Sequence, residues 1–191
     1  MVMSIERVFT RHCPKSTSPG QSIFRRSVNP IQSEDILVIL GTVQHAHPLG
    51  VRVLNAQIGN DHGDRTMVVG AIHRVLVDKQ IENDIARAMA NAVVFEVCDA
   101  PACQTCRGNG IHPKLGGIEP CPRCEGSGRL NPSERNILRV INCHLTSEDE
   151  ITRHRFRTKL YPLYMDMVDK LLVTANEASH AIRKHLKAFE E

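Results

Sequence analysis

CQTCRGNG at residues 103–110 and CPRCEGSG at residues 121–128 are two copies of one pattern, C-x-x-C-x-G-x-G. Four thiolates in two matched pairs are a typical ligand set for a closed, tetrahedral Zn²⁺ site. The two-residue gap lets a tight turn direct both sulfurs of a pair to one point, and the glycines allow the backbone to fold back over the metal. We therefore expect one structural Zn²⁺, held by Cys103, Cys106, Cys121 and Cys124.

The residues alone leave other uses of these cysteines open. Four thiolates also suit an iron–sulfur or mononuclear iron centre, although four-sulfur sites without a redox context mostly hold zinc. A redox C-x-x-C would need a surrounding βαβ pattern, which is absent here. His112 is an alternative ligand, but we interpret it as a surface residue of the loop. Catalytic zinc is disfavoured, because sulfur fills all four positions and leaves none for water.

The composition predicts a globular protein of one domain, or of one domain with an extension. The chain has 191 residues, of which 41% are hydrophobic, and a formal charge of +3. Charged residues follow the first methionines at once, so we expect no signal peptide, and no stretch approaches the roughly 18–20 apolar residues of a membrane span. We expect a cytoplasmic protein that does not bind membranes, in which Cys98 and Cys143 are free buried thiols.

Residues 1–32 are expected to form a flexible basic tail. They contain five Lys/Arg against one acidic residue, together with three prolines and several serines. The tail is either a solvated leader or an arm that touches polyanions. Residues 33–191 are predicted to form one helical DNA-binding domain, with the zinc insert at 99–130 and C-terminal helices over 147–190.

Apolar residues recur at helical spacing before the cysteine boxes. Ser33 is a candidate cap for a first helix, but residues 36–40 are equally compatible with a buried strand, so the state of residues 34–58 stays open. Asp64 is a candidate cap for an amphipathic helix, and residues 81–97 have a broad apolar face that predicts a further helix.

Two more helix starts follow the second cysteine box. Pro132 and Ser133 precede a segment with a helical apolar stripe, and residues 147–150 (SEDE) resemble a capping box. Pro162 is expected to break or restart the helix that follows. Beyond it, apolar residues at 164, 168, 171, 175, 178 and 182 form a heptad-like seam, which we expect to pack on the protein itself rather than in a coiled-coil dimer.

These elements predict a mainly α fold, a helical domain with a zinc-ribbon-like insert in the turn of a helix-turn-helix-like motif. The helix over 133–145 would carry Arg135, Asn136 and Arg139 on its first exposed turns. Arg and Asn are the usual bidentate partners of guanine and adenine, although an ordinary solvated helix carries such residues too. The candidate contacts to duplex DNA are Arg107, Lys114, Arg123, Arg129, Arg135, Asn136 and Arg139.

The charge of this region is modest. Residues 103–160 hold ten Lys/Arg and six Asp/Glu, and four thiolates with Zn²⁺ sum to −2, which leaves about +2. Phosphate contacts alone would therefore give weak, salt-sensitive binding. We expect no enzyme, because the chain has no paired carboxylates, nucleophile elbow or phosphate-binding loop.

The sequence resembles the lambda-like branch of the Q-type late-gene transcription antiterminators of lambdoid bacteriophages. The resemblance rests on the doubled cysteine box, on Pro132-Ser133 before a basic helix, on KLYPLY at residues 159–164 and on CPKS at residues 13–16. It implies a factor in the host bacterial cytoplasm that binds DNA near a late promoter and makes RNA polymerase read through terminators. It further implies contacts with the β-subunit flap and the sigma factor, and DNA binding by the region from Cys103 to Arg139.

A second class of protein uses the same cysteine box. In J-type co-chaperones, boxes of this kind bind unfolded polypeptide, but those proteins normally have four boxes and an N-terminal His-Pro-Asp loop. This chain has two boxes, and its His-Pro pairs continue as His-Pro-Leu and His-Pro-Lys. A zinc-finger module that binds polypeptide is the alternative function.

Overall fold

The computed structural model describes residues 5, 8–9, 33–100, 103–106, 110–114, 117–126, 128–130 and 132–190; for Ser33, Pro113, Lys114, Ile118, Phe189 and Glu190 it describes the backbone alone. The tail predicted for residues 1–32 lies almost wholly outside these ranges. The chain divides into two compact units, one of residues 1–68 and 169–191 and one of residues 69–168. Within the described ranges, no helix has the length and apolar character needed to cross a bilayer.

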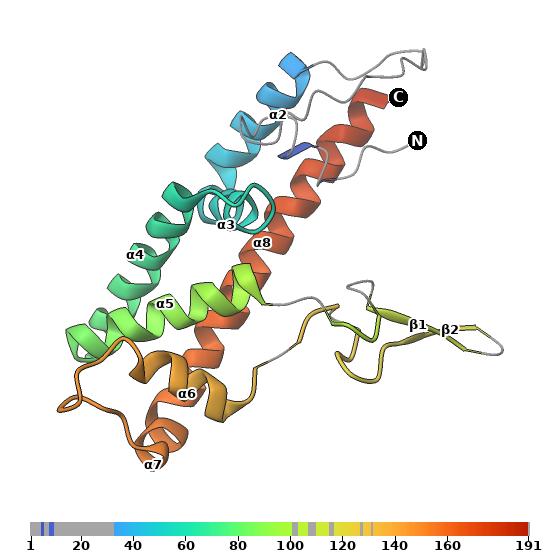
Figure 1. Ribbon diagram of the computed structural model, residues 1–191. Coiled ribbons are helices and arrows are strands. Elements are labelled where there is room, and N and C mark those ends of the chain that lie inside the picture. The colour runs from blue at the N-terminus through green and yellow to red at the C-terminus, as the bar shows by residue number, and fades with distance from the viewer. Residues whose placement is uncertain are drawn as a thin grey trace. The chain divides into compact units, whose positions relative to one another are not determined.

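The first unit contains α2 (Ser33–Ala46) and α3 (Pro48–Ile58), together with residues of α4 (His62–Asp78) and α8 (Tyr161–Glu190) (Figure 1). Residues 34–58, which the sequence left open between helix and strand, therefore form helices α2 and α3. Ile36, Ile39 and Val43 are buried on one side of α2, whereas Leu37 and Val38 are exposed. This spacing of three and four residues is that of an amphipathic helix, since a strand would bury alternate residues.

Gly50 sets how closely α3 approaches α8 within the first unit. A Cβ built at Gly50 would overlap the carbonyl oxygen of Thr174 and lie 2.8 Å from the Cβ of Ala178. Both of these positions are on α8, so a glycine in the first turn of α3 allows the two backbones to touch. Ala178 is fully buried in this contact.

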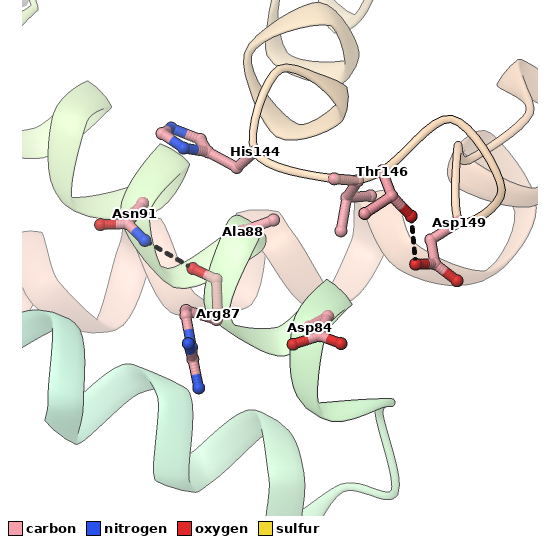
Figure 2. Close-up of a pocket in the computed structure, with 8 residues that line it drawn as sticks. Asp84, Arg87, Ala88, Asn91, His144, Thr146 and Asp149 are labelled. Carbon is pink, nitrogen blue, oxygen red and sulfur yellow. Dashed lines mark hydrogen bonds between the residues drawn. The ribbon is translucent and has the colours of Figure 1, made fainter.

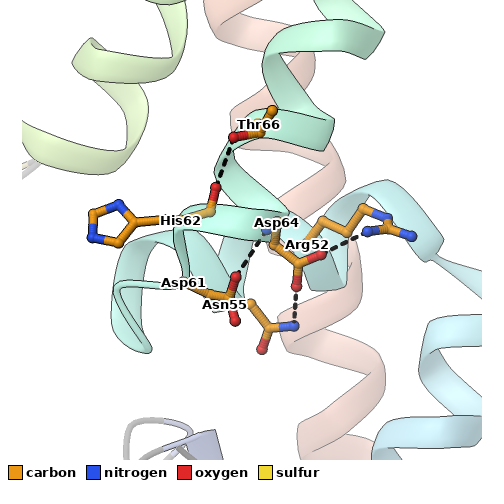
Figure 3. Close-up of polar contacts among 6 residues, drawn as sticks. All are labelled: Arg52, Asn55, Asp61, His62, Asp64 and Thr66. Atoms are coloured by element: carbon orange, nitrogen blue, oxygen red, sulfur yellow. Dashed lines mark hydrogen bonds and ion pairs between the residues drawn. The ribbon is translucent and has the colours of Figure 1, made fainter. Parts of the chain in front are cut away.

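A polar network joins the first turn of α4 to α3, as Figure 3 shows. The Asp64 carboxylate accepts hydrogen bonds from Arg52 Nη1 and Asn55 Nδ2, both at 2.6 Å. The prediction that Asp64 caps this helix is wrong: α4 begins at His62, and the Asp61 side chain accepts the Asp64 N–H at 2.9 Å. Asp64 lies in the first turn of α4, whereas a cap residue lies before it. Its carboxylate therefore bonds to Arg52 of α3 instead of capping α4.

The second unit contains α5 (Asn83–Asp99), a hairpin of β1 (Ile111–Lys114) and β2 (Gly117–Pro120), and α6 (Glu134–Asn142). The predicted helix at 81–97 is confirmed, two residues later in the chain. The helices α5 and α6 pack against each other. The strands are antiparallel, with Ile111 opposite Pro120 and Lys114 opposite Gly117. The mainly helical fold with a small, zinc-ribbon-like hairpin insert is therefore as predicted.

Three consecutive segments follow α6: α7 (Arg153–Arg155), the π-helix η1 (Phe156–Leu160) and α8. Pro162 lies in the first turn of α8 and does not end the helix. A proline lacks the N–H for the i−4 hydrogen bond, and its ring clashes with that carbonyl. Directly before it, the Tyr161 N–H bonds to Phe156 O, five residues back, which is the wider π-type turn. The helix thus passes the proline in a locally widened form.

The predicted capping box at residues 147–150 is wrong. These residues form turns, in which Thr146 Oγ1 donates to Asp149 Oδ2 at 2.6 Å, and the next helix begins at Arg153 with Thr152 as its cap. The side chain of Asn142 braces the loop, because it donates to Ile151 O and accepts from Ile151 N, both at 3.1 Å. Such a two-way amide clamp replaces the backbone pairing that a helix would have supplied.

Burial along the C-terminal helix confirms the seam. Tyr164, Val168, Leu171, Ala175, Ala178 and Ile182 are all buried within the described chain. This matches packing on the protein itself. The prediction for Cys98 and Cys143 is half right: Cys98 is buried, but Cys143 is exposed, because it follows α6 at the C-cap instead of continuing its apolar face.

Candidate metal centre and nucleic-acid surface

The four predicted ligand sulfurs lie together. The Sγ atoms of Cys103, Cys106, Cys121 and Cys124 are all within 4.8 Å of one another, and all four residues are buried. The Cys103–Cys121 sulfurs are 4.0 Å apart and the Cys106–Cys124 sulfurs 3.6 Å. A tetrahedron with Zn–S bonds of about 2.3 Å places its sulfurs about 3.8 Å apart. The cluster therefore has the size and burial needed to hold a metal ion.

The two cysteine boxes interlock through their last glycines. The N–H of Cys103 donates to Gly128 O at 2.8 Å, and the N–H of Cys121 donates to Gly110 O at 2.8 Å. The same glycines direct their own N–H groups to sulfur, Gly110 to Cys106 and Gly128 to Cys124, both at 3.3 Å. Each box thus completes the other by the same set of contacts, so the repeat in sequence becomes a two-fold repeat in structure.

Glycine is required at these positions by conformation. Gly110 and Gly128 have φ angles of 72° and 74°, in the left-handed region that side chains disfavour. A Cβ on Gly110 would in addition overlap the carbonyl oxygen of Gly126. The final glycine of each C-x-x-C-x-G-x-G box is therefore part of the fold of the centre.

The surroundings of the sulfurs favour thiolates. Hydrogen bonding by the backbone N–H of Cys106, against the opposing effect of burial, lowers the pKa of Cys103 to about 6. Burial would raise the pKa of Cys124, but the N–H of Gly128 and the neighbouring thiols lower it overall. Thiolate is the form that binds metal, so the backbone already provides part of the stabilisation that a cation completes.

A serine cap and two buried apolar residues hold α6, the helix that was predicted to contact bases. The Ser133 side chain accepts the Asn136 N–H at 3.4 Å and so caps α6, which begins one residue later than predicted. Ile137 and Ile141 are buried, and α6 packs on α5 with this face. Arg135, Asn136 and Arg139 are exposed. The helix thus has one face in the core and one cationic face in solvent.

The other predicted DNA contacts fall in different places. Arg107 lies outside the described residues, and of Lys114 only the backbone in β1 is described. Arg123 is exposed within the second box. Arg129 is half-buried, and its Nη1 lies 3.3 Å from Val97 O and 3.5 Å from Cys98 O, at the end of α5. It joins the four-cysteine module to this helix end, where a cation is favoured by the helix dipole.

Sequence reasoning did not identify this role of Arg129, because nothing near residue 129 signals its partners about thirty positions earlier in the chain. It also missed Glu134, whose Oε1 is buried and accepts no hydrogen bond from the described residues. The Oε2 atom of Glu134 lies 3.9 Å from Arg157 Nε.

A pocket of about 300 Å³ lies between α5 and the loop after α6, as Figure 2 shows. Asp84, Arg87, Ala88 and Asn91 line it from α5, and His144, Leu145, Thr146 and Asp149 from the loop. Acidic and basic groups both face it, so its charge selects no class of ligand.

A comparison with curated proteins finds no significant match. A comparison with protein families matches almost the whole chain, in two segments, residues 2–102 and residues 100–191. This chain therefore belongs to the family described as conserved hypothetical protein CHP02642.

Proposed function

We propose that this protein binds duplex DNA in a sequence-specific manner, with a zinc module in place of the flexible turn of a helix-turn-helix. The observation that carries the proposal is the pattern of α6, a capped helix whose buried face, Ile137 and Ile141, packs on α5 while Arg135, Asn136 and Arg139 are exposed. In helix-turn-helix proteins, the early residues of the second helix contact base edges in the major groove.

Zinc is the metal that best suits the centre. Four sulfur donors in a tetrahedral arrangement are typical of structural Zn²⁺, and with four protein ligands the coordination is complete. The role of the metal would thus be mechanical. Bound Zn²⁺ would hold the two boxes closed, and Arg129 would connect the module to the end of α5. The helices on either side of the insert would then meet DNA at a fixed angle.

Base reading would rest on side-chain geometry. The guanidinium groups of Arg135 and Arg139 suit the two acceptors of guanine, and the amide of Asn136 suits adenine. A good bidentate pair of this kind contributes about 1–3 kcal/mol of discrimination. Ser133 contributes by capping α6 and so holding its first turn in place.

The biological role that we propose is transcription antitermination in a bacteriophage. Support comes from the resemblance of the cysteine boxes, of Pro132-Ser133 and of residues 159–164 to the lambda-like Q proteins. In this role the DNA-bound protein would engage bacterial RNA polymerase near a late promoter, through the β-subunit flap and the sigma factor. It would act in the host cytoplasm.

Two experiments test the proposal. Selection from a random-sequence duplex pool should recover a preferred site, and Arg135→Ala and Arg139→Ala should weaken binding to that site by about ten-fold or more. Arg74→Ala, which removes an exposed cation of α4, is the matched control. If both α6 variants kept the affinity and the sequence preference of the wild type, α6 would be excluded as the helix that contacts bases. Terminator read-through by purified polymerase on a template with the cognate late promoter tests the antitermination role.

The alternative is binding of unfolded polypeptide by the zinc module. One observation favours it: Ile111, on the hairpin between the two boxes, is 48% exposed. This function predicts that the protein suppresses aggregation of an unfolded client and that Ile111→Ser removes the effect. Sequence-preferring DNA binding without client protection would exclude it.

A further inference from the structure

The segment Arg153–Leu160, which comprises α7 and η1, carries four Lys/Arg, one His and no acidic residue. Several contacts hold this segment in place within the second unit. Thr152 caps it, Phe156 and Leu160 are buried, and Arg155 Nη2 bonds to Glu82 Oε1 at 2.9 Å. The segment is thus a short, anchored rod.

The remaining cations of the rod face solvent. Arg153, Arg157 and Lys159 are exposed, and 71% of the Arg157 side chain is accessible. Arg157 Nε lies 3.9 Å from Glu134 Oε2, which is longer than a hydrogen bond. Glu134 begins α6, so this loose ion pair places Arg157 beside the helix turn that carries Arg135 and Asn136.

Positive charge is unevenly distributed along residues 103–160. Residues 103–152, which include the cysteine boxes and α6, hold six Lys/Arg and six Asp/Glu. Four thiolates with a divalent metal would make that region net negative. Within residues 103–160, the whole formal excess of positive charge therefore lies in the four Lys/Arg of the neighbouring rod.

We propose that Arg153 and Arg157, one helical turn apart on the same side of this segment, form a phosphate-binding surface that flanks the reading helix α6 and binds the backbone of duplex DNA. This inference rests on the proposed function, in which α6 enters the major groove. Phosphates border that groove, and contacts to them position a protein without reading sequence. The loose pairing with Glu134 holds the Arg157 side chain near α6 and leaves its terminal nitrogens available to a phosphate.

The test is the salt dependence of binding, measured for the full chain with two probes: a random-sequence duplex and the duplex recovered by selection. Each phosphate contact contributes about 0.9 to the slope of log affinity against log salt. The double variant Arg153→Ala, Arg157→Ala should lower the slope by about 1.8 with both probes, since two contacts are lost. The preference for the selected duplex should stay unchanged.

The control is a double variant with the same net charge, Arg74→Ala, Lys79→Ala, which removes exposed cations from α4 and from the turn after it. It should keep the wild-type slope. Helix content and metal content, measured for each variant, establish that the fold is intact; glutamine in place of alanine provides a second set. An intact Arg153→Ala, Arg157→Ala variant with an unchanged slope overturns this inference alone. A wild type that binds neither duplex overturns the proposed function and this inference together.

Discussion

The backbone N–H of Cys121 donates a 2.8 Å hydrogen bond to the carbonyl oxygen of Gly110, so the first cysteine of the second box is bonded to the last glycine of the first. The N–H of Cys103 makes the equivalent hydrogen bond to the carbonyl oxygen of Gly128. Neither box is complete alone, because each supplies the backbone partner of the other. The module should therefore gain or lose its structure, and its metal, in one step.

Loss of one sulfur should empty the centre. Cys106→Ser removes a buried ligand, whereas Cys143→Ser changes an exposed thiol outside the cluster. We expect one Zn²⁺ per chain in the wild type and in Cys143→Ser, and none in Cys106→Ser. The apparent binding free energy of a structural zinc, about 10–16 kcal/mol, is the folding free energy of such modules. Elemental analysis provides the test, and retention of zinc by Cys106→Ser would remove that cysteine from the ligand set.

Gly110→Ala should weaken the centre without touching a ligand. Alanine in the left-handed region costs about 1–2 kcal/mol, and here its Cβ would also overlap Gly126 O. Gly117→Ala is the control, since no atom lies within 4 Å of a Cβ at that position. Competition with a chromogenic chelator should show weaker metal binding in Gly110→Ala alone. Equal affinities in the two variants would contradict the close approach.

Gly50 and Gly41 offer a matched pair in the first unit. Gly50→Ala would force α3 away from Thr174 and Ala178 and should destabilise the fold by about 1–3 kcal/mol. Gly41→Ala, in α2 with no atom within 4 Å of its Cβ, should stabilise by up to about 1 kcal/mol because alanine is the better helix former. Urea denaturation measures both changes. Effects of the same sign would argue against the α3–α8 contact.

Arg129→Ala should lower stability, because Arg129 holds the cysteine module to the end of α5, and Arg123→Ala should leave stability unchanged. Arg129 donates to carbonyl groups at the end of α5, and hydrogen bonds from a charged donor are worth about 1.5–3 kcal/mol each. We expect lower stability, faster proteolysis near residue 100, and an affinity loss that is equal for all DNA sequences. Arg123 is exposed, so its variant should keep the wild-type stability. A change in base preference in Arg129→Ala would instead assign it to the DNA surface.

Alkaline pH should destabilise the second unit through Tyr164. Its hydroxyl donates to Glu96 Oε2 at 2.7 Å, and burial, reinforced by Glu96, raises the pKa of Tyr164 well above its usual range. The unfolded chain loses this proton near pH 10 while the folded chain keeps it, so stability present below about pH 10 falls as the pH rises further. Tyr164→Phe should show a smaller fall than the wild type. Thermal denaturation as a function of pH, with Tyr161→Phe as the control, tests this.

Local features of the sequence were sufficient where the partners are near in the chain. The spacing of the cysteines and glycines predicted a cluster that the structure brings within 4.8 Å. The helix start directly after Pro132, and the buried seam from Tyr164 to Ile182, were also predicted. In each case the controlling interaction spans a few residues or one helical period, so a one-dimensional pattern contains it.

Tertiary contacts decided the rest. Residues 36–40 are apolar enough for a strand, and the packing of Ile36 and Ile39 on one face of α2 determines the helix. The SEDE segment has the residues of a capping box, but the clamp of Asn142 on Ile151 holds a loop there and moves the helix start to Arg153. Arg129 was indistinguishable from the exposed Arg123 in sequence, and its contact with Val97 O separates them. The physical reason is common to all three: the deciding partner lies in another element, so its contribution exists only once the chain is folded.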